Sequence, residues 1–144
     1  MTVKPYEPAH LRALLLQPAQ AFLADALQDD GTGERIRQMS DAYTALDGDR
    51  VLACGGVMEL DPGHGMAWGI LAADLRHHMV GITRAVRRRL RASGMRRIQI
   101  QVKDDFAAGH LWARLLGFKD ETPNGMPEYR PGENYHLYAW VRHG

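Results

Sequence analysis

The segment from Ile98 to Phe118 constrains the fold of this chain more than any other. Apolar and polar residues alternate in its first part, IQIQV, which is the period of a half-buried strand. Its second part repeats apolar residues at helical spacing: Ala108, Leu111, Trp112, Leu115 and Leu116. Asp104 and Asp105 lie between these two parts, and aspartate accepts hydrogen bonds from the free amides at the start of a helix. Gly117 follows the second part, and glycine is the residue type that commonly ends a helix. The segment therefore predicts a strand, an aspartate-capped helix and a glycine stop.

The rest of the chain extends this pattern into an alternation of strands and helices. Strands are predicted at residues 2–6, 42–46, 50–60, 66–72, 98–102 and 135–141. One or two helices are predicted at 8–27, with an interruption at Pro18, and further helices at 34–40, 79–93 and from 105 onward. Residues 29–33 and 123–134 are predicted loops. A helix between strands 66–72 and 98–102 predicts a right-handed crossover that joins parallel strands. The fold class is α/β: one domain over residues 1–144, with a mixed central sheet flanked by helices.

Composition narrows the functional classes. The net charge of +1 gives no general reason to expect nucleic acid or membrane binding, and no apolar run approaches the roughly 20 residues of a membrane span. The N-terminus lacks the pattern of a signal peptide, so we expect a cytoplasmic protein. The single cysteine, Cys54, lies in an apolar strand and is predicted to be a buried, inert thiol. The histidines lack metal-ligand spacing, so no metal site is expected.

The order of elements resembles the GNAT acetyltransferases over nearly the whole chain. In that family a Q/R-x-x-G-x-G/A loop at a helix start holds the pyrophosphate of acetyl-CoA. The matching segment is Arg76, His77, His78, Met79, Val80 and Gly81. Arg76 and Gly81 fit the motif, whereas Met79 replaces its first glycine. The resemblance implies an acetyl-CoA site with weakened phosphate binding.

The same resemblance assigns the other expected site residues. The pantetheine arm of acetyl-CoA would pair with the backbone of Ile70, Leu71 and Ala72, and Glu59 is the candidate general base, with Asp74 as an alternative. Phe106 and Ala113 stand where the family has an Asn and a proton-donating Tyr. The implied activity is acetyl transfer from acetyl-CoA to an unknown amine, without an evident acid for the thiolate. Trp112 is interpreted as a core residue.

Several short segments also resemble the GNAT-like proteins of tailed bacteriophages and prophages. They are KPYEPAHL at 4–11, AWGIL at 67–71, GHLW at 109–112, PNGMPEY at 123–129 and GENY at 132–135. This narrower resemblance implies a phage-encoded protein in the host cytoplasm or in the virion. It keeps open the alternative that the fold is catalytically silent and serves a structural or virion-associated role, with other virion proteins as partners.

A basic helix face is the last feature that permits more than one interpretation. Arg84, Arg87, Arg88 and Arg91 fall on one side of the helix at 79–93, while Met79, Ile82, Val86 and Leu90 fall on another. The arginines form a solvated face, a nucleic-acid surface or contacts to the 3′-phosphate of CoA. Gln99 and Gln101 either flank a cleft or lie under this helix.

Overall fold

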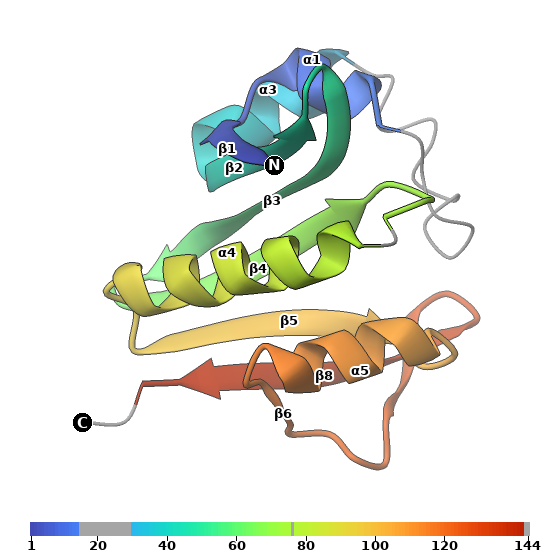
Figure 1. Ribbon diagram of the computed structural model, residues 1–144. Helices are drawn as coiled ribbons and strands as arrows, with labels where there is room; N and C mark the ends of the chain where they lie inside the picture. Colours follow the sequence, from blue (N-terminus) through green and yellow to red (C-terminus); the bar gives the residue numbers. More distant parts are fainter. Residues whose placement is uncertain (15–29, 76, 143–144) are drawn as a thin grey trace.

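A computed structural model describes residues 1–14, 30–75 and 77–142 of the 144-residue chain (Figure 1). The strands are β1 (Thr2–Pro5), β2 (Asp41–Asp47), β3 (Arg50–Asp61), β4 (His64–Leu71), β5 (Arg97–Lys103), β6 (Lys119–Asp120), β7 (Met126–Arg130) and β8 (Glu133–Val141). The helices are α1 (Pro8–Arg12), α3 (Asp30–Met39), α4 (His78–Ala92) and α5 (Ala107–Leu115). The predicted helix at 8–27 lies outside the described residues beyond position 14.

The strands form one mixed, twisted sheet in the order β1-β2-β3-β4-β5-β8-β6, with β7 also paired to β8. Every neighbouring pair is antiparallel except β4 and β5, which are parallel. The predicted α/β class, the mixed sheet and the crossover through α4 are therefore confirmed. The hairpin predicted around residues 47–49 is also present, as β2 and β3.

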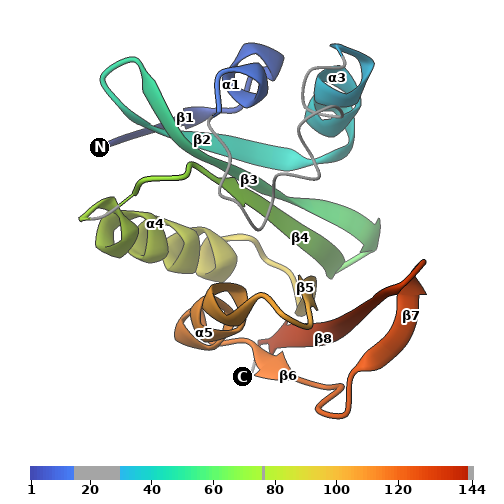
Figure 2. The ribbon, with the colours of Figure 1, turned by 90° about the vertical axis from the view of Figure 1, so that its right-hand side faces the viewer.

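Helices cover both faces of the sheet. Figure 2 shows α4 and α5 side by side on one face and α1 and α3 on the other. On α4 the predicted apolar side is confirmed, because Ile82 and Leu90 are buried and Met79 and Val86 pack against the core. Among the described residues, no helix is long and apolar enough to cross a membrane.

The loop predicted at residues 29–33 is wrong from Asp30 onward, because α3 already begins there. A tertiary contact overrides the low helix propensity of its two glycines. Tyr6 donates its hydroxyl to the Gly33 carbonyl over 3.0 Å, and a Cβ at Gly33 would stand 3.1 Å from Pro8 Cβ. Gly33 thus lets α3 pack closely on α1.

The loop predicted at residues 123–134 is also wrong, because most of it forms the hairpin of β7 and β8. Pro127 and Pro131 obscure the strand pattern, yet an edge strand tolerates proline. Gly132, at φ +72°, makes the tight turn between the two strands.

The start of α5 differs from the sequence prediction. Phe106 is the N-cap residue, and no side chain caps the helix. Asp104 instead accepts a hydrogen bond from His136, and Asp105 pairs with Lys103. The predicted aspartate cap is therefore wrong, because these carboxylates have cationic partners.

The buried side of α5 is rotated from the predicted one. Leu111 and Leu115 are 59% and 55% exposed, whereas Ala113 and Leu116 are buried. A Cβ at Gly109 would stand 3.0 Å from Val102 Cγ1, so this glycine brings the helix close to β5. The helix therefore packs on the sheet through Gly109, Ala113 and Leu116, and Leu111 and Leu115 face solvent.

Candidate functional site

The sheet opens between its two parallel strands. β4 and β5 pair at only three positions, of which Met66 with Gln99 is the last. Beyond that point β4 stays paired with β3 as far as Leu71, and β5 stays paired with β8 as far as Lys103. The two strands therefore diverge over their C-terminal halves. In α/β sheets, ligands bind beyond the carboxyl ends of parallel strands at such an opening.

A cavity of about 590 Å³ lies at this opening, between the sheet and the two helices α4 and α5. Its size is within the usual range of about 300–1,000 Å³ for small-molecule sites. Gly69 and Leu71 line it from β4, Ile100 and Val102 from β5, and Met79 and Trp112 from the helices. Among the residues that the structure describes, a Cβ at Gly69 would have Trp112 as its neighbour within 4 Å, at 3.9 Å. The glycine thus leaves room where the strands separate.

The N-terminal end of α4 is suited to an anion. His77 is the N-cap residue, and neither a capping side chain nor an acidic residue lies in the first turn. The His78 amide donates a hydrogen bond to the Leu75 carbonyl over 2.7 Å. Nε2 of the His78 ring lies 3.3 Å from Oδ2 of Asp47. Met79 packs against the core and lines the cavity, so its side chain is directed inward. A helix start of this kind attracts phosphate through its amides and dipole.

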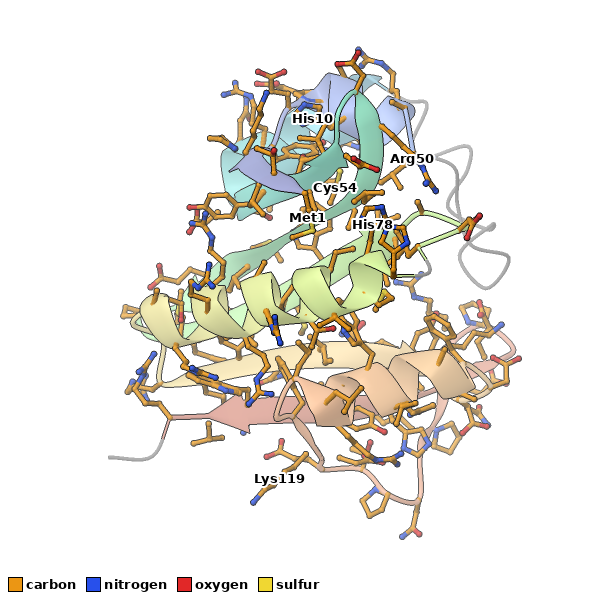
Figure 3. The ribbon with its side chains drawn as sticks, in the orientation of Figure 1. Met1, His10, Arg50, Cys54, His78 and Lys119 are labelled. Carbon is orange, nitrogen blue, oxygen red and sulfur yellow. The ribbon has the colours of Figure 1, made fainter. Side chains whose placement is uncertain are left out.

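Two further residues predicted to bind phosphate, Val80 and Gly81, lie in the first part of α4. Val80 is 60% exposed. A Cβ at Gly81 would stand 3.3 Å from Met1 Cε, so the first residue of the chain covers this glycine (Figure 3 labels Met1 and His78). Arg76 lies outside the described residues.

The predicted pantetheine segment is only partly at the cavity. Leu71 lines the cavity, whereas Ile70 and Ala72 are buried and do not. The Ala72 amide donates to the Leu52 carbonyl over 2.8 Å. Sequence reasoning missed Gly69, although a glycine inside a strand is a known sign that something approaches the backbone closely.

Glu59 lies near the β3–β4 turn, where its Oε1 accepts the Gly63 amide over 3.3 Å. Its side chain is exposed and does not line the cavity. The role of Glu59 stays a prediction. The alternative candidate, Asp74, is also exposed, and its carbonyl accepts a hydrogen bond from Arg50.

The cavity also reaches the other face of the sheet. Ile98 and Val102 pack against α5, so alternation along β5 places Gln99 and Gln101 on the opposite side. The interpretation that these glutamines lie under the arginine-rich helix is therefore wrong. Gln101 lines the cavity and donates to the Tyr129 hydroxyl. Tyr135, on β8, lines it as well.

Tyr135 is a second residue that sequence reasoning did not single out. It is 5% exposed, and its ring lies 5.4 Å from that of Tyr129. Within the described part of the chain, its hydroxyl has no hydrogen-bond partner. Tyr135 reaches the cavity because β8 pairs with β5. No local sequence motif predicts that pairing.

The four arginines of the basic face are all exposed on α4. Across residues 1–14, 30–75 and 77–142, none of Arg84, Arg87, Arg88 and Arg91 forms an ion pair. Arg89 differs from them, because its guanidinium stacks 3.6 Å above the centre of the Tyr43 ring.

No family model matches the sequence, and neither does any curated protein. Solved structures do match the fold. A ribosomal-protein-alanine N-acetyltransferase from Brucella melitensis is 14% identical, with a TM-score of 0.72, over 99% of this chain and 100% of its own. An acetyltransferase from Streptococcus agalactiae is 18% identical, with a TM-score of 0.71, over 98% of each chain.

A third solved structure, from Desulfovibrio desulfuricans, is assigned to the GNAT family of acetyltransferases. It is 18% identical, with a TM-score of 0.67, over 97% of this chain and 98% of its own. The chain therefore has the GNAT fold along almost its entire length.

Proposed function

We propose that this chain is a GNAT acyltransferase, which transfers an acyl group from a CoA thioester, such as acetyl-CoA, to an amine. The observation that carries the proposal is the divergence of β4 and β5 beyond Met66 and Gln99, with a cavity at the opening. The fold shared with solved acetyltransferases supports it.

The two ends of the thioester substrate have separate sites in this proposal. The pyrophosphate lies at the uncapped first turn of α4, beside His77 and His78. Arg76 stays a contact predicted from the sequence motif alone. The pantetheine arm lies between the helices along Gly69 and Leu71, because both residues line the cavity. The acceptor amine enters from the face of Gln101 and Tyr135.

The reaction is a direct displacement. The neutral amine nitrogen attacks the thioester carbonyl, the carbon–sulfur bond breaks, and the CoA thiolate leaves. The amine loses one proton to a base, for which Glu59 is the predicted candidate. The thiolate gains one proton, and we assign its delivery to Tyr135, which is the tyrosine of β8 that lines the cavity. Phage origin, virion partners and nucleic-acid binding through the basic face stay predictions.

The test is a thermal-shift titration with acetyl-CoA and with CoA. A ligand at 100 times its dissociation constant adds about 2.7 kcal/mol to the free energy of unfolding. We expect a saturable rise in melting temperature that Gly69→Phe abolishes, because the new ring occupies the opening beside Trp112. Ala107→Phe is the control, since Ala107 is exposed and lies outside the cavity lining.

No shift at millimolar acetyl-CoA contradicts the proposal and favours a catalytically silent role for the fold. Binding followed by release of free CoA thiol in the presence of a panel of primary amines supports catalysis. Binding without thiol release from any amine limits the function to CoA binding.

A further inference from the structure

We propose that the cavity receives an acyl chain longer than acetyl, which extends from the β4–β5 opening to the space beneath α4. This inference rests on the proposed acyltransferase function and specifies its donor substrate. The ligand is the acyl chain of a CoA thioester of medium length.

The floor of this space is built from very small residues. Strand register places three rows of side chains on the α4 face of β2, β3 and β4. The rows are Asp41–Val57–Ala67, Tyr43–Gly55–Gly69 and Ala45–Ala53–Leu71. All nine residues line the cavity, and five of them are glycine or alanine. Strands are usually rich in branched and aromatic residues. The small residues here therefore leave more space than usual between the sheet and α4.

The roof and one side of the space are formed by α4 and by a pair of stacked side chains. Ile82, Ala85 and Val86 of α4 line the cavity from above. At the β2 edge, the stacking of Arg89 on Tyr43 closes the side of the space. The far end lies at Ser93 and Met95, beyond the C-terminal end of α4.

The accessibility of the floor shows that the space is open to a ligand. Gly69 is exposed, and Gly55, Val57 and Ala67 are half-buried, although all four lie on central strands. Residues at such positions are normally buried between a sheet and its helices. The floor is therefore accessible through the same opening that would admit the thioester.

The chemistry of the lining selects an apolar chain. The charged residues of the lining are Asp41, Arg89 and Lys103, and these lie at its β2 and β5 edges. Between these edges the floor consists of Gly55, Gly69, Ala53, Ala67, Val57 and Leu71, which offer no polar side chain. A cavity of about 150 Å³ is enough for benzene. The cavity of about 590 Å³ is several times larger, so it has room for the pantetheine arm beside Gly69 and Leu71 and for more than the two carbons of acetyl.

The experiment measures dissociation constants by calorimetry for CoA and for its acetyl, butyryl, hexanoyl and octanoyl thioesters. Burial of each added methylene is expected to tighten binding by up to about fourfold. We expect hexanoyl-CoA to bind at least tenfold more tightly than acetyl-CoA. Octanoate alone is the second arm, because a free fatty acid presents the same chain without the nucleotide.

Two variants fill the space from opposite sides: Ala85→Phe from the roof and Ala45→Leu from the floor. Both are expected to remove the gain with chain length and to leave acetyl-CoA binding within about twofold. Ala107→Phe makes a matched change outside the cavity and should keep the gain. Circular dichroism identifies a variant that fails to fold, and the chain-length series on the unmodified protein decides the question without variants.

Equal affinity for all chain lengths, with acetyl-CoA still bound, overturns this inference and leaves the acyltransferase proposal intact. Octanoate that binds as tightly as octanoyl-CoA overturns it in favour of a free fatty-acid site. Failure of every CoA thioester to bind contradicts the acyltransferase proposal itself.

Discussion

Trp112 on α5 donates its indole N–H to Thr83 Oγ1 on α4 over 2.9 Å. This hydrogen bond joins the two helices above the cavity, and the same tryptophan lies beside Gly69 at the strand opening. Trp112 is half-buried and packs against both hydrophobic clusters of the protein. It therefore fixes the spacing of α4 and α5 as well as filling the core.

Thr83→Val is expected to lower the free energy of unfolding by about 1–2 kcal/mol, because it keeps the shape of the side chain but leaves the indole N–H without an acceptor. Urea denaturation measures the change. Thr83→Ser keeps the acceptor and should lose less stability than the valine variant. A valine variant as stable as the unmodified protein, or a serine variant that loses more than the valine variant, would mean that the methyl group, and not the hydrogen bond, matters.

The sequence was sufficient for the parts of the fold that depend on local patterns. Gly117 ends α5 at φ +94°, with Phe118 N–H donating to the Ala113 carbonyl and Gly117 N–H to that of Arg114. These two bonds form a Schellman motif, and the predicted glycine stop at Gly117 is confirmed. Sequence periodicity likewise located β5 and the core side of α4.

The features that sequence reasoning missed depend on long-range contacts. Asp104 does not cap α5 because its carboxylate accepts a hydrogen bond from His136, which is 32 residues away in the sequence. Tyr135 reaches the cavity only through the pairing of β8 with β5. The floor beneath α4 combines residues of β2, β3 and β4, and a single small residue in any one strand does not reveal a cavity.

His136 is held between two carboxylates, with Nδ1 2.8 Å from Asp120 Oδ2 and Nε2 3.0 Å from Asp104 Oδ1. Burial alone would lower the pKa of His136, but the bonds to Asp120 and Asp104 outweigh it and raise the pKa. Both ring nitrogens donate, so the folded protein favours the imidazolium. The His110 ring lies 5.1 Å away, edge to face.

A raised histidine pKa stabilises the fold below the unfolded pKa of about 6.5, and this contribution is lost as pH rises through the folded pKa. We expect the free energy of unfolding to fall as pH rises above about 6.5, and His136→Gln to lack this part of the slope. Urea denaturation at several pH values measures it. Parallel profiles for the two proteins would show that His136 does not titrate differently on folding.

Asp120 changes the free energy of unfolding with pH in the opposite direction to His136. Burial opposes its ionisation, but the Thr122 amide and His136 lower its pKa. Its contribution is present above the unfolded pKa of about 3.9 and is lost as pH falls through the folded value. Asp120→Asn should therefore flatten the acid limb of the same profile.

Cys54 is buried on β3, with its sulfur 3.7 Å from Thr44 Oγ1. Burial raises the pKa of the thiol to about 11, although the Thr44 hydrogen bond opposes the shift. Fewer than about one thiol in a thousand is then ionised at pH 7.5. We expect a disulfide reagent to label the native protein slowly and the urea-unfolded protein fully. Fast labelling of the native state would show that β3 opens locally.

Tyr135→Phe tests the assigned proton donor. Loss of a general acid typically lowers the rate by about 10²–10⁴-fold. Because a thiolate is a good leaving group even without an acid, we expect a smaller fall in kcat, of about tenfold. KM for the thioester should change little, because the ring remains. Tyr129→Phe is the matched control, since Tyr129 lies outside the cavity lining. An unchanged kcat, or equal losses in the two variants, would remove Tyr135 from the chemistry and leave it a packing residue of β8.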